Sequence, residues 1–319
     1  MTSALTSFAA PVSPLANIAA TRAVLSRHGL ATKKSLGQNF LVNDRVVARI
    51  IELSEAGPSD TVLEVGPGIG TLTAALLPRV SHVLSVERDA DLPAVLAETC
   101  GVFSNFTLVE KDALDLDEGD LDLAFGDAAA SHDAPTKFIA NLPYAVAATL
   151  VLGFFERFES IESATVMVQS EVADRMEAAP GTKEYGAYTV KLGLHARPTG
   201  RFQVAAGSFF PPPHVTSSVI RLERRGEEGL TFEDKRYAAL AADAAFAQRR
   251  KTIANSMKGY FSGRGAQGAS VVAHLPAVLE SAGVDARRRG ETLSREEFIE
   301  LGRALRRAEG KGRAERTGL

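Results

Sequence analysis

The segment Val62–Gly70 reads VLEVGPGIG, and it constrains the fold of this chain more than any other stretch. It begins as an apolar strand that carries one acid, Glu64, and three glycines then follow at alternate positions. Glycine lets the backbone turn sharply and lets a ligand approach the main chain closely. A helical pattern begins directly afterwards at Thr71. The spacing G-x-G-x-G differs from the G-x-G-x-x-G of dinucleotide sites, and the turn alone is consistent both with a ligand site and with a purely structural glycine turn.

Strand-like and helix-like segments alternate around this turn, from about Lys33 to Leu222. Such alternation predicts an α/β fold with a Rossmann-like parallel sheet covered by helices on both faces. The expected strands are Thr61–Val65, His82–Val86, Phe106–Val109, Lys137–Ala140 and Ala164–Val168, followed by Arg201–Val204 and Val215–Leu222 near the sheet edge. The expected helices between them are Thr71–Pro78, Asp91–Glu98 and Ala145–Phe158.

The rest of the chain divides by composition. Residues 33–223 form the α/β domain, and the charged segment RRGEEG at 224–229 reads as a linker. Residues 231–308 form a small all-α domain, and we expect residues 1–32 and 309–319 to be a largely disordered extension and a disordered tail. Helices of the second domain are expected over Phe232–Phe246, Gln248–Tyr260, Val271–Ala282 and Ser294–Arg307.

Charge is unevenly distributed between these parts. The formal net charge of the chain is −3. Residues 231–319 hold 17 Lys and Arg against 11 Asp and Glu, a net charge of +6, which leaves −9 for the remainder. A basic C-terminal part can present a local face to phosphates even on an acidic protein. Solvated helix faces would produce the same count, so charge alone leaves both interpretations open.

Cysteine count and hydropathy favour a cytoplasmic protein. Cys100 is the single cysteine, so no disulfide forms within the chain, and no Cys/His cluster has the spacing of a metal site. The N-terminus lacks the charged start of a secretory signal. No apolar run reaches the roughly 18–20 residues needed to span a bilayer. We therefore expect no metal and no membrane association.

Two acids follow successive strands of the expected sheet. Glu87 ends the second strand, where a carboxylate of a doubly wound sheet meets the ribose hydroxyls of a nucleoside. Asp112 follows the third strand and could accept from an adenine amino group. Each acid alone could be a solvated strand end or turn residue. Together with the glycine turn they favour a nucleoside ligand.

The sequence NLPY at 141–144 follows the fourth strand. The Asn141 amide oxygen and the Leu142 carbonyl can accept from an exocyclic amine and turn its lone pair towards an electrophilic methyl group, while Pro143 stiffens the turn. Tyr144 can stack on a base that has left its helix, and Phe209 is a second stacking candidate. Phe209 could equally belong to the core, with Phe210 taking its place.

These motifs together resemble the ribosomal RNA adenine dimethyltransferase family, from Lys34 onward. The resemblance rests on LGQNFL (36–41), VERD (86–89), DAL (112–114), QSEVA (169–173), PGTKEYG (180–186), FFPPPHVTSSVIRL (209–222) and AFAQRRKTIANS (245–256), besides the glycine turn and NLPY.

The resemblance implies a class I S-adenosylmethionine-dependent methyltransferase sheet with a small helical domain. It implies methylation of N6 of two adjacent adenosines near the 3′ end of small-subunit (16S) rRNA, to dimethyladenosines, within a pre-30S particle. We expect a monomer. By resemblance Asn39 and Leu41 close over the cofactor and Gly66 lies against it, while Glu87 holds the ribose and Asp112 the cofactor adenine; Gly68, Ala113 and Asn141 complete the cofactor set.

Basic residues supply candidate RNA contacts. Arg249, Arg250 and Lys251 fall in the QRRK run, which is expected to open a helix, and Lys33 and Lys34 could add a second contact. Arg287–Arg289 could contribute or could be merely solvated. The chain departs from the family pattern at Ala145, Ser170, His214 and Thr216, where the family commonly has Asn, Lys, Lys and Asp. These departures concern RNA contact and pocket shape.

Three alternatives compete with this interpretation. A resistance-type methyltransferase of large-subunit rRNA typically shows SQNF and NIPY and lacks the QRRKT helix. A ribosome-assembly binding factor with little turnover would not need the Asn39, Glu87, Asp112 and NLPY set. An NAD-dependent dehydrogenase is excluded by the glycine spacing and by the lack of a catalytic acid/base pair.

Overall fold

A computed structural model describes residues 11–32, 38–125, 134–226 and 229–317. The chain forms two compact units. The first comprises residues 1–173 and 198–224, and the second comprises residues 174–197 and 225–319. Within the described ranges, no helix combines the length and the apolar character that crossing a membrane requires.

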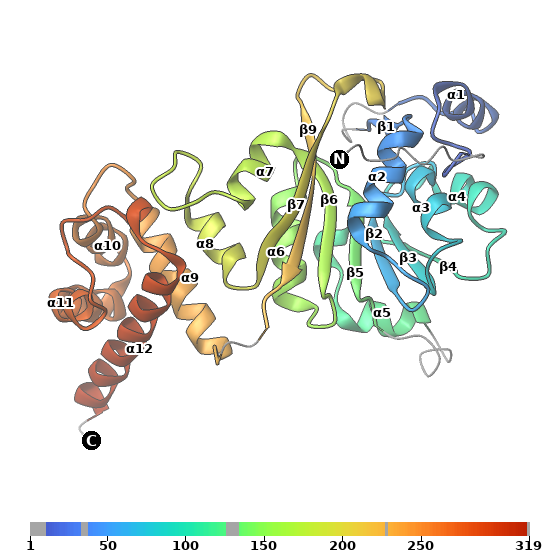
Figure 1. The fold of residues 1–319 in the computed structure, drawn as a ribbon. Coiled ribbons are helices and arrows are strands. Elements are labelled where there is room, and N and C mark those ends of the chain that lie inside the picture. Colours follow the sequence, from blue (N-terminus) through green and yellow to red (C-terminus); the bar gives the residue numbers. More distant parts are fainter. Residues whose placement is uncertain (1–10, 33–37, 126–133, 227–228, 318–319) are drawn as a thin grey trace. The chain divides into compact units, whose positions relative to one another are not determined.

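The first unit is built on a seven-stranded sheet of order β4-β3-β2-β5-β6-β9-β7 (Figure 1). Neighbouring strands from β4 to β6 are parallel, whereas β9 is antiparallel to β6, so the sheet is mixed with a parallel core. All seven expected strands are confirmed, with β7 at the edge and β9 one strand inside it. The strands are β2 (Thr61–Val65), β3 (His82–Glu87), β4 (Phe106–Glu110), β5 (Lys137–Asn141), β6 (Ser163–Gln169), β7 (Ala196–Val204) and β9 (Ser217–Arg224).

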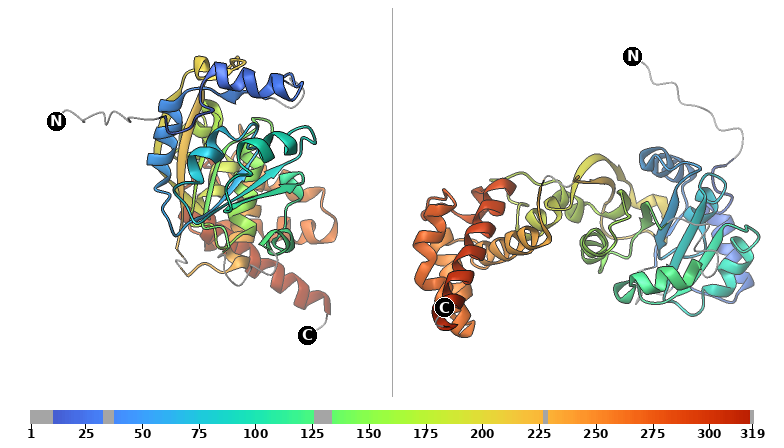
Figure 2. Two further views of the ribbon diagram at one scale, coloured as in Figure 1. Left: turned by 90° about the vertical axis from the view of Figure 1, so that its right-hand side faces the viewer. Right: turned by 90° about the horizontal axis from the view of Figure 1, so that it is seen from below.

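Helices cover both faces of this sheet (Figure 2). Consecutive residues of a strand point to opposite faces, and in β5 these are Phe138 and Ile139. Ile139 shares a buried cluster with Ile50 of α2 (Asp44–Ser54). The Phe138 ring meets Phe154 of α6 (Ala147–Arg157), with 4.8 Å between ring centroids. The other helices of this unit are α3 (Thr71–Leu76), α4 (Pro93–Thr99) and α5 (Glu118–Phe125), and α7 (Ser170–Met176) spans the unit boundary.

The N-terminal segment contains a helix that the sequence did not predict. Helix α1 (Ile18–Arg27) buries Val24 and Leu25 in one cluster with Phe40 and Ile69. The prediction of a largely disordered extension is therefore wrong for residues 11–32 and lies outside the described residues for 1–10. A ten-residue helix is marginal by itself, so these contacts with distant residues are what stabilise it.

Asp44 fastens the start of this segment to the unit. Its carboxylate accepts hydrogen bonds from the backbone N–H groups of Val12 and Ser13, at 3.0 and 2.8 Å. Hydrogen bonds to a charged acceptor are stronger than those between neutral groups. The segment before α1 is thus fixed to the first turn of α2.

The second unit is a helical bundle in which the helix Phe232–Phe246 has the predicted bounds, the helix Ala187–Gly193 was not predicted, and the other helices differ at their ends from the predicted ones. Helix α10 begins at Ile253 rather than Gln248, and α12 continues through Thr317, so the expected disordered tail is wrong as far as Thr317. Residues 318 and 319 lie outside the described part. The helices are α8 (Ala187–Gly193), α9 (Phe232–Phe246), α10 (Ile253–Ser262), α11 (Gly265–Ser281) and α12 (Arg295–Thr317).

The first unit ends at residue 224, next to the expected boundary at residue 223, but the chain also crosses between the units earlier than expected. Residues 174–197 belong with the C-terminal helices, because α8 contributes Val190 to their core and Lys191 pairs with Asp243 of α9 at 3.0 Å. Nothing in the local composition of residues 174–197 marks this change.

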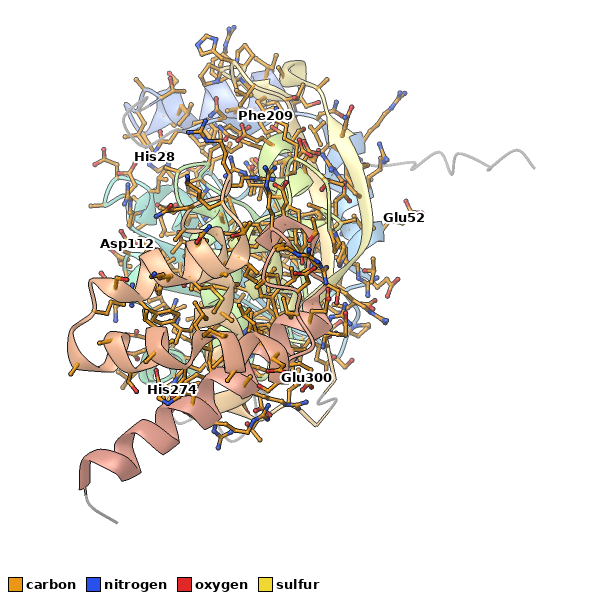
Figure 3. The ribbon with its side chains drawn as sticks, turned by 90° about the vertical axis from the view of Figure 1, so that its left-hand side faces the viewer. His28, Glu52, Asp112, Phe209, His274 and Glu300 are labelled. Atoms are coloured by element: carbon orange, nitrogen blue, oxygen red, sulfur yellow. The ribbon has the colours of Figure 1, made fainter. Side chains whose placement is uncertain are left out.

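Replacing Asp44 by Ala should release the segment before α1. We expect the free energy of unfolding to fall by about 2 kcal/mol, since two hydrogen bonds to a charged acceptor are lost. Urea denaturation followed by circular dichroism measures this change. Glu52→Ala is the matched control, because Glu52 is an exposed acid of the same helix (Figure 3). Equal stability of the two variants would show that Asp44 does not anchor the segment.

Candidate active site

A cavity of about 550 Å³ lies in the first unit, where the carboxyl ends of its parallel strands meet. Residues that follow β2, β3, β4 and β5 line it, together with the segment around the short strand β1 (Phe40–Leu41). Of the predicted site residues, the structure brings together Asn39, Leu41, Gly66, Gly68, Glu87, Asp112, Ala113, Asn141, Leu142, Pro143 and Tyr144.

The glycine turn fits against its neighbours only without side chains. Gly68 has a φ of +62°, and a Cβ atom there would lie 3.2 Å from the Phe40 ring. Gly70 has a φ of +85°, and its Cβ would lie 2.5 Å from the Cys100 sulfur. Larger residues would be strained in backbone conformation and would clash. The turn therefore exposes main chain to the cavity, as a ligand held against the backbone requires.

Glu64, in the strand before this turn, links the turn's flanking elements by hydrogen bonds. The side chain is fully buried and accepts hydrogen bonds from Thr73 of α3 at 2.7 Å and from Ser85 of β3 at 2.8 Å. Burial raises the pKa of Glu64 to about 7 against the lowering effect of both hydroxyls. One acid thus ties β2, β3 and the helix after the turn together.

Glu87 reaches the cavity from the end of β3. Its Oε1 atom accepts from the backbone N–H groups of Arg88 and Asp89, both at 2.9 Å. Burial raises the pKa of Glu87, and these backbone donors oppose the effect. Asp89 in turn accepts from the Gln38 amide at 2.7 Å, which fastens the segment before β1 to the turn after β3. Glu87 is therefore a hydrogen-bond acceptor held in a fixed position in a buried part of the cavity lining.

Asp112 also lines the cavity, and its side chain is 35% exposed. Its Oδ1 accepts from the Leu114 backbone N–H at 3.0 Å, and its Oδ2 pairs with Arg88 at 3.0 Å. The backbone bond, and then Arg88, lower the pKa of Asp112. The carboxylate stays ionised and can accept from a ligand amine.

The NLPY loop also lines the cavity. The Asn141 amide nitrogen donates to the Asn39 carbonyl at 3.4 Å, so the amide oxygen is presented on the other side. The Leu142 N–H donates to Met167 of β6 at 3.1 Å. Pro143 lies against the turn, since a Cβ on Gly66 would be 3.6 Å from its ring. The loop is held at three points, which suits two acceptors that must stay in place.

Phe209 does not join this group. The residue, labelled in Figure 3, is 3% exposed, packs in the cluster that contains Leu41 and Val219, and is absent from the residues that line the cavity. The short strand β8 (Phe209–Phe210) pairs with β1, placing Phe209 opposite Leu41 and Phe210 opposite Phe40. Phe210 also lies outside the lining, with the Arg22 guanidinium 4.9 Å from its ring centroid. In this conformation Phe209 is a core residue, the interpretation that the sequence left open.

The predicted RNA-contacting residues lie elsewhere. The QRRK run forms the turn between α9 and α10 instead of opening a helix, because α10 begins only at Ile253. Arg249 pairs with Glu291 at 3.0 Å and donates to the carbonyls of Thr182 and Lys183, so it holds the unit together. Arg250 and Lys251 are exposed. Lys33 and Lys34 lie outside the described residues.

Several contributors to the site were not found from the sequence. Thr73 and Ser85 hold Glu64, Gln38 and Asp89 pair, and Ser217 contacts Tyr144. Gln38, Asp89 and Ser217 fall within the motifs LGQNFL, VERD and FFPPPHVTSSVIRL, which was the available signal, but their partners are far away in the chain. Metal-ligating clusters of three or more His, Cys, Asp or Glu are absent from the described residues.

Comparison with known proteins matches both fold and sequence. Residues 29–301 match the sequence model of the family described as "Ribosomal RNA adenine dimethylase". The chain is 39% identical over 292 residues to "Ribosomal RNA small subunit methyltransferase A" of Shouchella clausii, covering 91% of this chain and 95% of the relative. It is 40% identical over 293 residues to the protein of the same name from Pelotomaculum thermopropionicum, covering 90% and 96%.

Two solved structures share the fold. A dimethyladenosine transferase from Plasmodium falciparum aligns with a TM-score of 0.67 and 23% identity, over 82% of this chain and 95% of the other. The 23S rRNA methyltransferase ErmE aligns with a TM-score of 0.59 and 26% identity, over 84% and 100%.

The raised pKa of Glu64 gives a pH-dependent prediction. The folded protein keeps this proton up to about pH 7, whereas the unfolded chain releases it near 4.5, so the group lowers the free energy of unfolding as the pH rises through this window. Glu64→Gln removes the ionisation and keeps an oxygen that accepts from both hydroxyls. We expect its stability relative to the native protein to increase by on the order of 3 kcal/mol between about pH 4.5 and 8.

Denaturant titrations across this range measure the difference. Glu52→Gln, in the exposed part of α2, is the control and should show no such trend. A stability difference for Glu64→Gln that stays constant with pH would contradict the assigned ionisation.

Proposed function

This chain belongs to the ribosomal RNA adenine dimethylase family, and from that premise we propose that it transfers methyl groups from S-adenosylmethionine to N6 of two adjacent adenosines near the 3′ end of small-subunit (16S) rRNA. The products are N6,N6-dimethyladenosines, made within a pre-30S particle during ribosome biogenesis. The observation that carries the proposal is a single cavity in which the glycine turn, Glu87, Asp112 and the NLPY loop meet.

The cavity residues fit the proposed cofactor. Gly66 and Gly68 of the glycine turn line the cavity without side chains, so their main chain can lie against a ligand. Glu87 is a buried carboxylate that can accept hydrogen bonds from both ribose hydroxyls and would repel a phosphate. Asp112 can accept from the adenine amine. Asn39, Leu41, Gly66, Gly68, Ala113 and Asn141 would complete the contacts.

The bound cofactor supplies an electrophilic methyl group on a sulfonium. The chain's own task is to present the amine of adenine, a poor nucleophile because its lone pair is shared with the ring. The Asn141 amide oxygen and the Leu142 carbonyl accept hydrogen bonds from the two N–H groups of this amine and direct its lone pair towards the methyl group. Tyr144 stacks on the base, and Pro143 keeps the loop rigid. The methylated amine is acidic enough to lose its proton to water, so no strong base is needed.

RNA contact is the task we assign to the exposed basic residues. Arg250 and Lys251 are exposed in the turn between α9 and α10, which supports their assignment to phosphate contacts, and Lys33 and Lys34 are proposed as a second contact. Arg249 can contribute only if its pair with Glu291 opens. A large-subunit target is not favoured, since the relatives with the higher identities are named as small-subunit enzymes.

Glu87→Ala should weaken binding of S-adenosylmethionine by about ten- to a hundredfold, because charge-assisted hydrogen bonds to the ribose are lost. RNA affinity should stay within about twofold, as the two ligands use different residues. Calorimetry and filter binding measure the two affinities. Glu110→Ala is the matched control, because Glu110 pairs with Glu87 in register at the end of β4 but is exposed and outside the cavity.

The pH dependence of cofactor binding follows from the same residue. Because burial raises the pKa of Glu87, the affinity for S-adenosylmethionine should decline as the pH falls through that raised value, at a higher pH than for an ordinary glutamate.

Equal loss of cofactor and RNA binding in Glu87→Ala would contradict the proposed division of roles between the cofactor-binding and RNA-binding residues.

Mass mapping of small-subunit rRNA from cells that lack this protein tests the function itself. We expect the two adjacent adenosines to be unmethylated, to regain four methyl groups with the native gene, and to stay unmethylated with Asn141→Ala. Purified Asn141→Ala should fold normally and bind pre-subunits, with turnover reduced by at least about a hundredfold. Dimethyladenosines that persist in the deletion strain would refute the proposal, and full rescue by Asn141→Ala would indicate a binding factor.

A further inference from the structure

The Tyr144 hydroxyl meets the Ser217 hydroxyl at 2.6 Å. Tyr144 lines the cavity with part of its ring accessible, whereas Ser217 is fully buried and outside the cavity lining. The two residues are 73 positions apart in the sequence. A residue outside the cavity lining thus holds one that lines the cavity.

Ser217 is a rigid anchor because the sheet fixes its backbone. It begins β9 and pairs in register with Gln169, the last residue of β6, which itself lines the cavity. The neighbouring bond from the Ser170 N–H to the Thr216 carbonyl, 2.9 Å long, secures the same point of the ladder. The serine hydroxyl therefore has a defined position at the cavity edge.

A tyrosine ring anchored only at its Cα can turn about two side-chain bonds. In this loop Pro143 restrains the backbone before the ring, and Ser217 holds the hydroxyl at its far end. A ring held at both ends presents a face of fixed direction, which a base can meet without further ordering. The hydrogen bond between the two hydroxyls restrains the far end of the ring, which the loop backbone alone does not.

We propose that Ser217 is a positioning residue for the methyl transfer, whose hydroxyl holds the Tyr144 ring in the orientation that stacks on the target adenine. The inference rests on the proposed function and adds to it a residue that binds neither cofactor nor RNA. It also gives a reason for a serine at this place in the FFPPPHVTSSVIRL segment.

The adjacent serine provides a built-in comparison. Ser218 is equally buried and lies on the same strand, but successive strand residues point to opposite faces. Its hydroxyl bonds with Ser170 at 2.9 Å and accepts from Arg201 at 3.0 Å. Removing the Ser218 hydroxyl disturbs the same strand without touching Tyr144.

The test is a double-mutant cycle on methylation of small-subunit particles. We expect Ser217→Ala and Tyr144→Phe each to lower kcat by about three- to tenfold, the factor that one net hydrogen bond corresponds to. The double variant should be no slower than the slower single variant, because both changes break the same contact. The dissociation constant for S-adenosylmethionine should stay within about twofold. Ser217→Thr keeps a hydroxyl and should restore kcat, and Ser218→Ala should behave like the native enzyme.

The outcomes separate the inference from the function on which it rests. Native kcat in Ser217→Ala, effects that multiply in the double variant, or an equal loss in Ser218→Ala would each overturn the positioning role while the native enzyme remains active. If Ser217→Ala does not fold, Tyr144→Phe decides, since an unchanged kcat in that variant overturns the role as well. A native protein without methylation activity would refute the proposed function, and the inference with it.

Discussion

The close packing of the glycine turn against Phe40 and Pro143 is the constraint on which the rest of this structure depends. A Cβ atom on Gly68 would lie 3.2 Å from the Phe40 ring, which is too close for ordinary packing, and one on Gly66 would lie 3.6 Å from Pro143, in van der Waals contact. The turn, the segment around β1 and the NLPY loop must therefore meet at the ends of the parallel strands. Each of the three carries a predicted ligand contact, so one packing requirement assembles the cavity. The β1–β8 pair extends it, since it fastens Phe40 and Leu41 to the FFPPP segment.

Hydrogen bonds between buried or partly buried polar side chains hold these segments in fixed positions. Glu64 ties β2 to β3 and α3, and Gln38 ties the segment before β1 to Asp89. Ser217 ties β9 to the Tyr144 ring. Burying a polar group is costly unless it is hydrogen-bonded, so each pair favours one arrangement over its alternatives. The N-terminal helix adds apolar contact on the outer side, where Val24 shares a cluster with Phe40 and Ile69. Residues that line the cavity are thus held partly by one another and partly by residues outside the lining, such as Ser85 and Ser217.

The two units divide the chemistry. The first carries an acidic, largely preformed cavity suited to a nucleoside and an amine. The second carries exposed basic residues, with Arg250 and Lys251 in a turn between helices. Not every charge in that turn is available to RNA, because Arg249 is paired with Glu291 and with two carbonyl groups. A count of basic residues therefore overstates how many of them are available for the proposed RNA contact. The structure identifies which of the basic residues in this turn are paired and which are exposed.

The sequence by itself determined the seven strands, the covering helices α3, α4 and α6, and eleven of the residues that line the cavity, because short apolar runs, glycine spacing and strand-end acids are local patterns. It could not determine helix α1, the contribution of residues 174–197 to the helical unit, or the end of α12. Those depend on burial against residues distant in the chain, which local composition does not record. The same reason explains why Phe209 was ambiguous and why Ser217 was missed. Whether a ring lies in the core or a hydroxyl reaches a tyrosine is decided only when strands far apart in sequence are brought into register.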